Sequence, residues 1–121
     1  MINYHVTPVT DSVHWVGVVD WNLRDFHGFT TTKGGTYNAF VIDGPEPILI
    51  DTVKAPFARE FLGKVAQVTE LKKIKHIVVN HIEPDHSGSF PEVLRHVPDA
   101  TVYASENGAA GLHRYYDFDR P

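Results

Sequence analysis

The sequence has no cysteine, no long apolar run and no cluster of basic residues, and each absence excludes a class of protein. Without cysteine, neither a disulfide framework nor a thiolate metal site is available. No stretch approaches the roughly 20 apolar residues that span a membrane, and the first residues lack the pattern of a signal peptide. The 11 Lys and Arg against 15 Asp and Glu argue against nucleic acid and anionic membrane surfaces as partners. We therefore expect a cytoplasmic protein.

Short β-rich runs dominate the first half of the chain. Residues 13–19 are mostly apolar and favour a strand that is covered on both faces. Two more strands are expected at residues 37–42 and 48–50. The Asp-Gly-Pro sequence at residues 43–45 is typical of a turn, which predicts that these two strands pair antiparallel.

The second half alternates helices and strands. Pro56 suits a first helical position, and apolar residues recur at helical spacing as far as Val68, which places Lys64 on the exposed side. The further elements that we expect are a strand at 76–80, a short helix at 90–97, a strand at 101–104 and a last helix at 105–116. With 42% hydrophobic residues, the 121-residue chain suffices for one domain with a buried core. The order predicts an α+β fold, in which helices cover one side of a mixed sheet.

The most informative feature is the sequence His-Ile-Glu-Pro-Asp-His at residues 81–86, here called the 81–86 loop, directly after a buried strand. Two imidazoles and two carboxylates in six residues suit an iron or zinc centre. In an extended segment alternate side chains share one face, about 6–7 Å apart, so His81, Glu83 and Asp85 converge while His86 points elsewhere. The loop is expected to serve two adjacent ions, one held by His81 with Glu83 and the other by Asp85 with His86.

A simpler explanation of the 81–86 loop needs no metal. Asp85 or Ser87 would cap the following helix, and the histidines would be ordinary loop residues. Capping accounts for either of these two residues, but it does not account for His81, Glu83 and His86 together. The metal-site interpretation is therefore the better one.

The pattern His-x-Glu-x-Asp-His resembles the iron-binding loop of flavodiiron proteins (A-type flavoproteins), which belong to the metallo-β-lactamase superfamily. Hydrolases of that superfamily have His at the position of Glu83. A carboxylate there gives a harder, anionic ligand set that suits iron in two oxidation states. The resemblance continues upstream, in the family's order and at compatible spacing, through residues 20–28, 35–40 and 49–52.

The resemblance implies roles for individual residues. His81 and Glu83 would bind the iron nearer the flavin, and Asp85 and His86 would bind the second iron. In the family a further His, a bridging Asp and another His from later in the chain complete the site, and these positions have no counterpart here.

Two residues outside the loop also receive roles. His27 would lie in the substrate pocket and donate a hydrogen bond to bound dioxygen or nitric oxide, and a solvent-facing loop histidine remains the alternative. Asp51 ends a predicted strand, where it either orients the metal loop or serves as a turn or cap residue.

The resemblance further implies a fold and a domain organisation. Residues 1–121 would form the N-terminal half of a metallo-β-lactamase-like αββα sandwich, a partial diiron domain with a mixed, mostly antiparallel sheet. The flavodoxin-like domain that carries FMN in the family is absent from these residues. The chain would be an excised fragment, a truncated gene product or one subunit of a split protein. A half domain leaves apolar surface uncovered, which predicts self-association or poor solubility as a monomer.

The activity implied for the parent protein is reduction of dioxygen to water, of nitric oxide to nitrous oxide, or of both. Two iron ions, about 3.5–4 Å apart, would act together with electrons that FMN supplies. The implied partners are a redox donor such as a rubredoxin or a flavin reductase, and a second copy or a complementary chain. A zinc-dependent hydrolase and a non-catalytic subunit or interaction module are the alternatives. The isolated 121 residues are not expected to catalyse the reaction.

Overall fold

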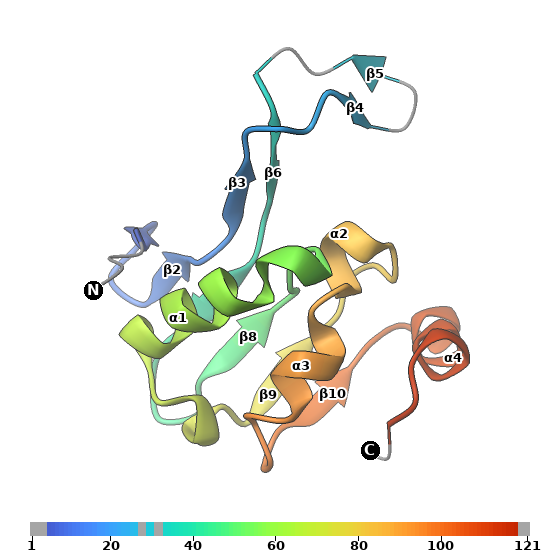
Figure 1. The fold of residues 1–121 in the computed structure, drawn as a ribbon. Helices are drawn as coiled ribbons and strands as arrows, with labels where there is room; N and C mark the ends of the chain where they lie inside the picture. Colours follow the sequence, from blue (N-terminus) through green and yellow to red (C-terminus); the bar gives the residue numbers. More distant parts are fainter. Residues whose placement is uncertain (1–4, 27–28, 31–32, 119–121) are drawn as a thin grey trace.

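A six-stranded mixed sheet forms the centre of the computed structural model, which describes residues 5–26, 29–30 and 33–118 (Figure 1). Its strands are β1 (Thr7–Pro8), β2 (Val13–Trp15), β7 (Phe40–Ile42), β8 (Ile48–Ile50), β9 (His76–Val78) and β10 (Thr101–Tyr103). They lie side by side in the order β1-β2-β7-β8-β9-β10. The pairs from β1 to β8 are antiparallel, whereas β8, β9 and β10 run parallel to one another. The predicted antiparallel pairing of the strands around residues 43–45 is confirmed.

Helices cover one face of the sheet. The helical elements are η1 (Ala55–Phe57), α1 (Ala58–Val68), η2 (Leu71–Lys73), α2 (Pro84–Ser87), α3 (Phe90–Leu94) and α4 (Glu106–Tyr115). Helices α1 and α3 contact each other and lie on the same side of β8, β9 and β10 (Figure 1). The predicted α+β class with a mixed sheet is therefore confirmed. Within the described residues, none of the helices is both long and apolar enough to cross a membrane.

The core lies between this helical layer and the sheet. Phe61 and Val65, one helical turn apart on α1, are fully buried, as is Phe90 at the start of α3. Leu49 and Ile77 occupy the middle of β8 and β9, where they are paired across the parallel register. Burying side chains of this size stabilises the fold by about 1.5–3 kcal/mol each. The helical spacing that predicted α1 is thus the spacing of its buried face.

The strand predicted at residues 13–19 is instead two strands. Strand β2 stays in the main sheet, whereas β3 (Val18–Asp20) pairs with β6 (Gly35–Tyr37) in a two-stranded arm. Figure 1 shows this arm extending away from the sheet, with β4 (Asp25–Phe26) and β5 (Phe29–Thr30) at its tip. Gly17 lies at the break, where a Cβ atom would come within 2.2 Å of the Tyr37 carbonyl oxygen. The close approach of two backbones at this point requires glycine.

The predicted exposure of Lys64 is wrong. Its side chain is only 7% exposed, and its Nζ pairs with Glu60 one helical turn earlier, at 3.2 Å. The same Nζ donates a 2.6 Å hydrogen bond to the carbonyl oxygen of Gly17 at the strand break. The Lys64 ammonium group therefore lies on the buried side of α1. The Glu60 carboxylate oxygen and the Gly17 carbonyl oxygen compensate the cost of burying its charge. The helix predicted at 90–97 is also shorter, since α3 ends at Leu94.

Candidate metal centre

The 81–86 loop lies where two neighbouring parallel strands end. Asp51 directly follows β8, and Asn80 and His81 follow β9 after one intervening residue. Because the carboxyl ends of parallel strands meet at one edge of a sheet, these residues come together although they are about 30 positions apart. Figure 1 shows α2, which contains Asp85 and His86, at this edge. Ligand sites in α/β sheets are commonly found outside the carboxyl ends of the strands.

The first donor pair consists of His81 and Glu83. His81 Nε2 lies 3.0 Å from Glu83 Oε1, and the side chains are 51% and 39% exposed. The other ring nitrogen, Nδ1, accepts a hydrogen bond from the backbone N–H of Ile82 at 3.1 Å. In the neutral imidazole the proton is consequently on Nε2, which donates to the carboxylate. A metal ion that binds both Nε2 and Oε1 would require the other tautomer, with the proton on Nδ1.

The second donor pair consists of Asp85 and His86, and it has a third, buried partner. His86 Nε2 lies 3.5 Å from Asp85 Oδ2, and His86 Nδ1 lies 3.3 Å from Asp51 Oδ2. Asp51 also accepts hydrogen bonds from the backbone N–H of Asn80 at 2.8 Å and from its amide Nδ2 at 3.1 Å. A carboxylate beside Nδ1 keeps the imidazole proton there and turns the Nε2 lone pair toward a ligand. Of the two roles expected for Asp51, these contacts favour that of orienting the loop.

Asp51 adopts a backbone conformation that is unusual for a side-chain-bearing residue. Its φ of 63° lies in the left-handed region, and among the described non-glycine residues it alone has a positive φ. Its N–H donates to the Val78 carbonyl of β9 at 2.8 Å, which holds this conformation in place. Left-handed residues of this kind cost about 1 kcal/mol and occur often at functional sites. Aspartate tolerates the region better than most residues.

The backbone of the second half of the loop is also held firmly. The His86 carbonyl accepts two hydrogen bonds from Thr52, one from its N–H at 2.8 Å and one from its Oγ1 at 2.7 Å. Thr52 is fully buried. At Gly88 a Cβ atom would lie 2.5 Å from the Pro84 carbonyl oxygen and 2.7 Å from the Ala55 nitrogen. The chain after α2 therefore packs directly against the start of η1.

The predicted extended geometry of the loop is wrong. Pro84 begins the short helix α2, which brings Asp85 and His86 onto a helical turn. The rings of His81 and His86 lie 5.3 Å apart between centroids, so the two donor pairs are adjacent. The capping explanation is also wrong, because α3 has Ser89 as its N-cap residue and no side-chain hydrogen bond there.

The donor chemistry of each pair fits a divalent iron or zinc ion. Two ligands at right angles with bonds of about 2.1 Å lie about 3 Å apart, which is close to the separations in both pairs. Each pair offers one imidazole nitrogen and one carboxylate oxygen. Across the ranges that the structure describes, no group of three or more His, Cys, Asp or Glu side chains is arranged to hold a metal ion. The loop thus fits two metal ions as a partial ligand set.

Three further residues are candidates for a functional role, namely His27, Asn80 and Thr52. His27, the expected substrate-pocket residue, lies outside the described residues. Asn80 and Thr52, which hold Asp51 and His86, were not recognised as functional from the sequence. Their only sequence signal is position: Asn80 precedes the predicted ligand His81, and Thr52 follows Asp51, for which a role in orienting the loop was one of two expectations.

A buried phenol lies at the base of the arm. The Tyr37 hydroxyl donates a 2.7 Å hydrogen bond to Asp20 Oδ2, and the side chain is 2% exposed. Burial raises the pKa of Tyr37 well above its usual range, and the hydrogen bond to Asp20 and the charges of Asp20 and Asp85 raise it further. Tyr37 therefore stays protonated at pH values at which an ordinary tyrosine ionises.

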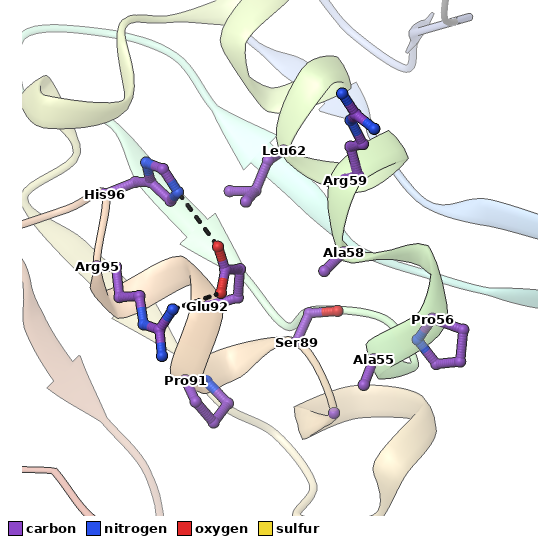
Figure 2. A pocket seen from close by; sticks show the side chains of 11 residues that line it. Ala55, Pro56, Ala58, Arg59, Leu62, Ser89, Pro91, Glu92, Arg95 and His96 are labelled. Carbon is purple, nitrogen blue, oxygen red and sulfur yellow. Dashed lines mark ion pairs between the residues drawn. The ribbon is translucent and has the colours of Figure 1, made fainter.

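A groove of about 710 Å³ runs between α1 and α3 on the helical face (Figure 2). Glu92 pairs there with Arg95 Nη1 at 3.3 Å and with His96 Nε2 at 3.5 Å, as the dashed lines in Figure 2 show. The described residues that line the groove include none from the 81–86 loop. The groove is therefore separate from the two donor pairs.

Comparison with known proteins gives consistent matches. A family model described as ODP family beta lactamase matches residues 36–121. The chain is 43% identical over 110 residues to a protein from Moorella thermoacetica named nitric oxide reductase, and the match covers 89% of this chain and 28% of that protein.

Two solved structures are similar over nearly the whole chain. The flavodiiron protein from Giardia intestinalis has a TM-score of 0.89 and 37% identity, with 96% of this chain and 28% of that chain covered. The rubredoxin oxygen:oxidoreductase from Desulfovibrio gigas has a TM-score of 0.85 and 36% identity, with 95% and 29% covered. These likenesses confirm the predicted resemblance in fold. The chain spans a little over a quarter of the length of these relatives.

Proposed function

Because this chain belongs to the ODP beta lactamase family and its relatives are flavodiiron proteins, we propose that it supplies part of a diiron centre. The parent protein would be an oxidoreductase that reduces dioxygen to water, nitric oxide to nitrous oxide, or both. The observation that carries this proposal is the pairing of one imidazole and one carboxylate twice within a single loop, at 3.0 Å and 3.5 Å. The names of the relatives, a nitric oxide reductase and a rubredoxin oxygen:oxidoreductase, support both substrates.

Each pair would hold one ion through named atoms. His81 Nε2 and Glu83 would bind one iron, and Asp85 and His86 Nε2 would bind the other. When bound, the two irons would supply the redox chemistry, with FMN as the source of electrons. Neutral His81 would bind through Nε2 only after its proton moves to Nδ1, which ends the hydrogen bond from the Ile82 N–H, whereas His86 would keep its proton on Nδ1, where Asp51 accepts the hydrogen bond. The first pair would therefore change its tautomer on binding, and the second pair would not.

The remaining parts of the site would come from outside these residues. Residues 1–121 would be a partial diiron domain, and the other ligands and a flavodoxin-like domain with FMN would be supplied by a longer polypeptide or a complementary chain. A redox donor protein such as a rubredoxin or a flavin reductase would provide electrons. We further propose a head-to-tail homodimer for the complete protein and a cytoplasmic location. His27 remains the proposed hydrogen-bond donor to the bound diatomic.

Anaerobic reconstitution tests the proposal. The protein from the full reading frame is loaded with ferrous salt, its metal content is measured by mass spectrometry, and its consumption of nitric oxide and dioxygen is followed with a reduced donor. We expect two iron ions per chain, and we expect His86→Ala to reduce both the iron content and the activity. The matched control is His96→Ala, an exposed histidine in the groove, which should change neither.

The alternatives give different results in the same experiment. Stoichiometric zinc together with hydrolysis of esters or lactams would favour the zinc-dependent hydrolase. Failure to retain any metal would overturn the diiron proposal and favour a non-catalytic interaction module.

A further inference from the structure

Helix α4 contacts the 81–86 loop. Tyr116, which follows α4, contacts Ser87, the residue after the loop. The Tyr116 hydroxyl lies 2.9 Å from Ser87 Oγ, and Ser87 Oγ in turn donates to the Ile82 carbonyl oxygen. A serine hydroxyl has one proton, which Ser87 gives to Ile82, so Tyr116 must be the donor in the contact between the two hydroxyls. The result is a directed chain of hydrogen bonds from Tyr116 through Ser87 to Ile82. Ser87 is fully buried, which protects this chain from competition with water.

The same region of the chain also packs against Ile82. A Cβ atom at Gly111 of α4 would lie 2.8 Å from Ile82 Cδ1, so the helix backbone approaches this side chain closely. The Tyr116 ring lies 6.2 Å from the ring of buried Phe90, which holds the phenol in position. Tyr116 is the C-cap residue of α4, and its N–H donates a hydrogen bond to the Leu112 carbonyl oxygen. Ile82 is thus held through its side chain by α4 and through its carbonyl by Ser87 and Tyr116.

The position of Ile82 in the sequence connects these contacts to the first donor pair. It stands between His81 and Glu83, and its N–H donates to His81 Nδ1. Its N–H belongs to the peptide group shared with His81, and its carbonyl belongs to the peptide group shared with Glu83, so the backbone at Ile82 sets the positions of both side chains of the first donor pair. Without the contacts to α4 and Ser87, binding of a metal would have to fix this backbone, and the lost conformational entropy would weaken the affinity.

We propose that Tyr116 is a positioning residue that holds the first donor pair of the metal centre through Ser87 and the Ile82 carbonyl. The proposal deepens the proposed function and rests on it, since it assigns a residue that neither donates to the metal nor lies in the 81–86 loop. Substitution of the hydroxyl alone separates the hydrogen bond from the ring packing. The variant is Tyr116→Phe. The matched control is Tyr115→Phe, because Tyr115 is the neighbouring residue and is 69% exposed.

Amide hydrogen exchange in metal-free protein from the full reading frame tests the hold directly. Tyr116→Phe should accelerate exchange at residues 82–87 about 5-fold, which corresponds to the loss of one net hydrogen bond. Tyr115→Phe should leave it unchanged. Unchanged exchange in Tyr116→Phe would overturn the proposal. Faster exchange spread evenly over all of α4 would also overturn it, because the substitution would then loosen the helix and not the loop.

Metal binding supplies the second readout. The anaerobic affinity for Co²⁺ should fall about 5-fold in Tyr116→Phe, with a change in the visible absorption of the bound Co²⁺, while the unfolding midpoint without metal falls by only the few degrees that the loss of one hydrogen bond causes. Ser87→Ala should have the same effect, and the double variant should be no weaker than Ser87→Ala, because both changes interrupt one chain. Additive losses of Co²⁺ affinity in the double variant would contradict the proposal that both residues act through one chain of hydrogen bonds. If wild-type protein binds neither Co²⁺ nor ferrous iron, the proposed function fails, and the exchange measurement still decides the role of Tyr116.

Discussion

The two donor pairs of the 81–86 loop have the same chemical composition but different surroundings. In the first pair His81 is 51% exposed and Glu83 is 39% exposed, whereas in the second pair His86 is 31% exposed and Asp85 is 15% exposed. Both pairs bring an imidazole nitrogen near a carboxylate oxygen. The difference lies in the hydrogen-bond partner of Nδ1, the ring nitrogen of each imidazole that faces away from the metal site.

The second pair is prepared by the fold, and the first is prepared less completely. Buried Asp51 accepts a hydrogen bond from His86 Nδ1, and Thr52 donates twice to the His86 carbonyl. Behind His81, the only contact of Nδ1 that the described residues supply is with the N–H of the next residue, Ile82. We therefore expect His86 to have a fixed tautomer before metal arrives, and His81 to gain its final order with the metal. Five variants test this difference between the pairs.

Removing the carboxylate behind His86 should have the largest effect. Asp51→Ala leaves the Asn80 donors and His86 Nδ1 without their buried acceptor and keeps an unfavourable positive φ. The unfolding free energy should fall by about 2–4 kcal/mol, and iron affinity should fall on the order of 10- to 100-fold. Chemical denaturation and anaerobic iron titration measure the two effects.

A second substitution at this position separates charge from shape. Asp51→Asn keeps the size of the side chain and its tolerance of the left-handed region, so the loss of stability should be smaller while the affinity for iron still falls. If Asp51→Asn bound iron as tightly as the wild type, the carboxylate would not be what orients His86, and the contrast between the pairs would disappear.

The tight packing behind the second pair predicts the next effect. Gly88→Ala places a Cβ atom against two backbone atoms, the Pro84 carbonyl oxygen and the Ala55 nitrogen, neither of which can move alone. We expect a loss of about 1–3 kcal/mol in unfolding free energy, measured by denaturant titration. Gly35→Ala is the matched control, since the atoms nearest to its Cβ belong to the Leu23 side chain, with Cδ2 at 2.8 Å, and the end of a flexible side chain can shift. Equal losses in both variants would contradict the tight packing.

The sequence predicted those elements whose signals are local. Helical spacing identified α1 through Phe61 and Val65, and the Asp-Gly-Pro turn identified the pairing of β7 with β8. The helical course of the loop had a local signal as well, because Pro84 is typical of a first helical position. The prediction of an extended loop did not take this position of Pro84 into account.

The remaining features depend on contacts between distant segments. Lys64 is buried because the strand break at Gly17 presents a free carbonyl to α1, and neither residue indicates this alone. The hold of Asp51 on His86 requires that β8 and β9 be neighbours in a parallel sheet. Likewise, Tyr116 reaches Ser87 only because α4 returns to the loop. The ligand residues could therefore be read from one loop, whereas their supports could not.

The second pair also interacts electrostatically with a buried side chain. The charge of Asp85 is one of the causes that raise the pKa of Tyr37. The unfolded state loses the Tyr37 proton near pH 10 and the folded state retains it to higher pH. Stability from this group is thus complete below about pH 10 and is lost as the pH rises.

Comparison of the wild type with Tyr37→Phe tests this sign. Between about pH 9 and 11 the difference in unfolding free energy between the two proteins should narrow by about 1.4 kcal/mol, because the phenylalanine has no proton to lose. Urea denaturation at a series of pH values gives this difference. Parallel curves would show that Tyr37 has an ordinary pKa.

The first pair should show the smallest effect on stability and still affect the metal. Glu83→Gln removes the charge beside His81 Nε2 in a half-exposed contact, so the unfolding free energy should change by no more than about 0.5 kcal/mol. Iron affinity should nevertheless fall about 10-fold, because a neutral amide is a poorer ligand than a carboxylate. Glu92→Gln is the matched control: Glu92 is 42% exposed and pairs with His96 at 3.5 Å, away from the loop. A large loss of stability in Glu83→Gln would mean that the first pair is as firmly built into the fold as the second, and equal iron binding in both variants would remove Glu83 from the ligand set.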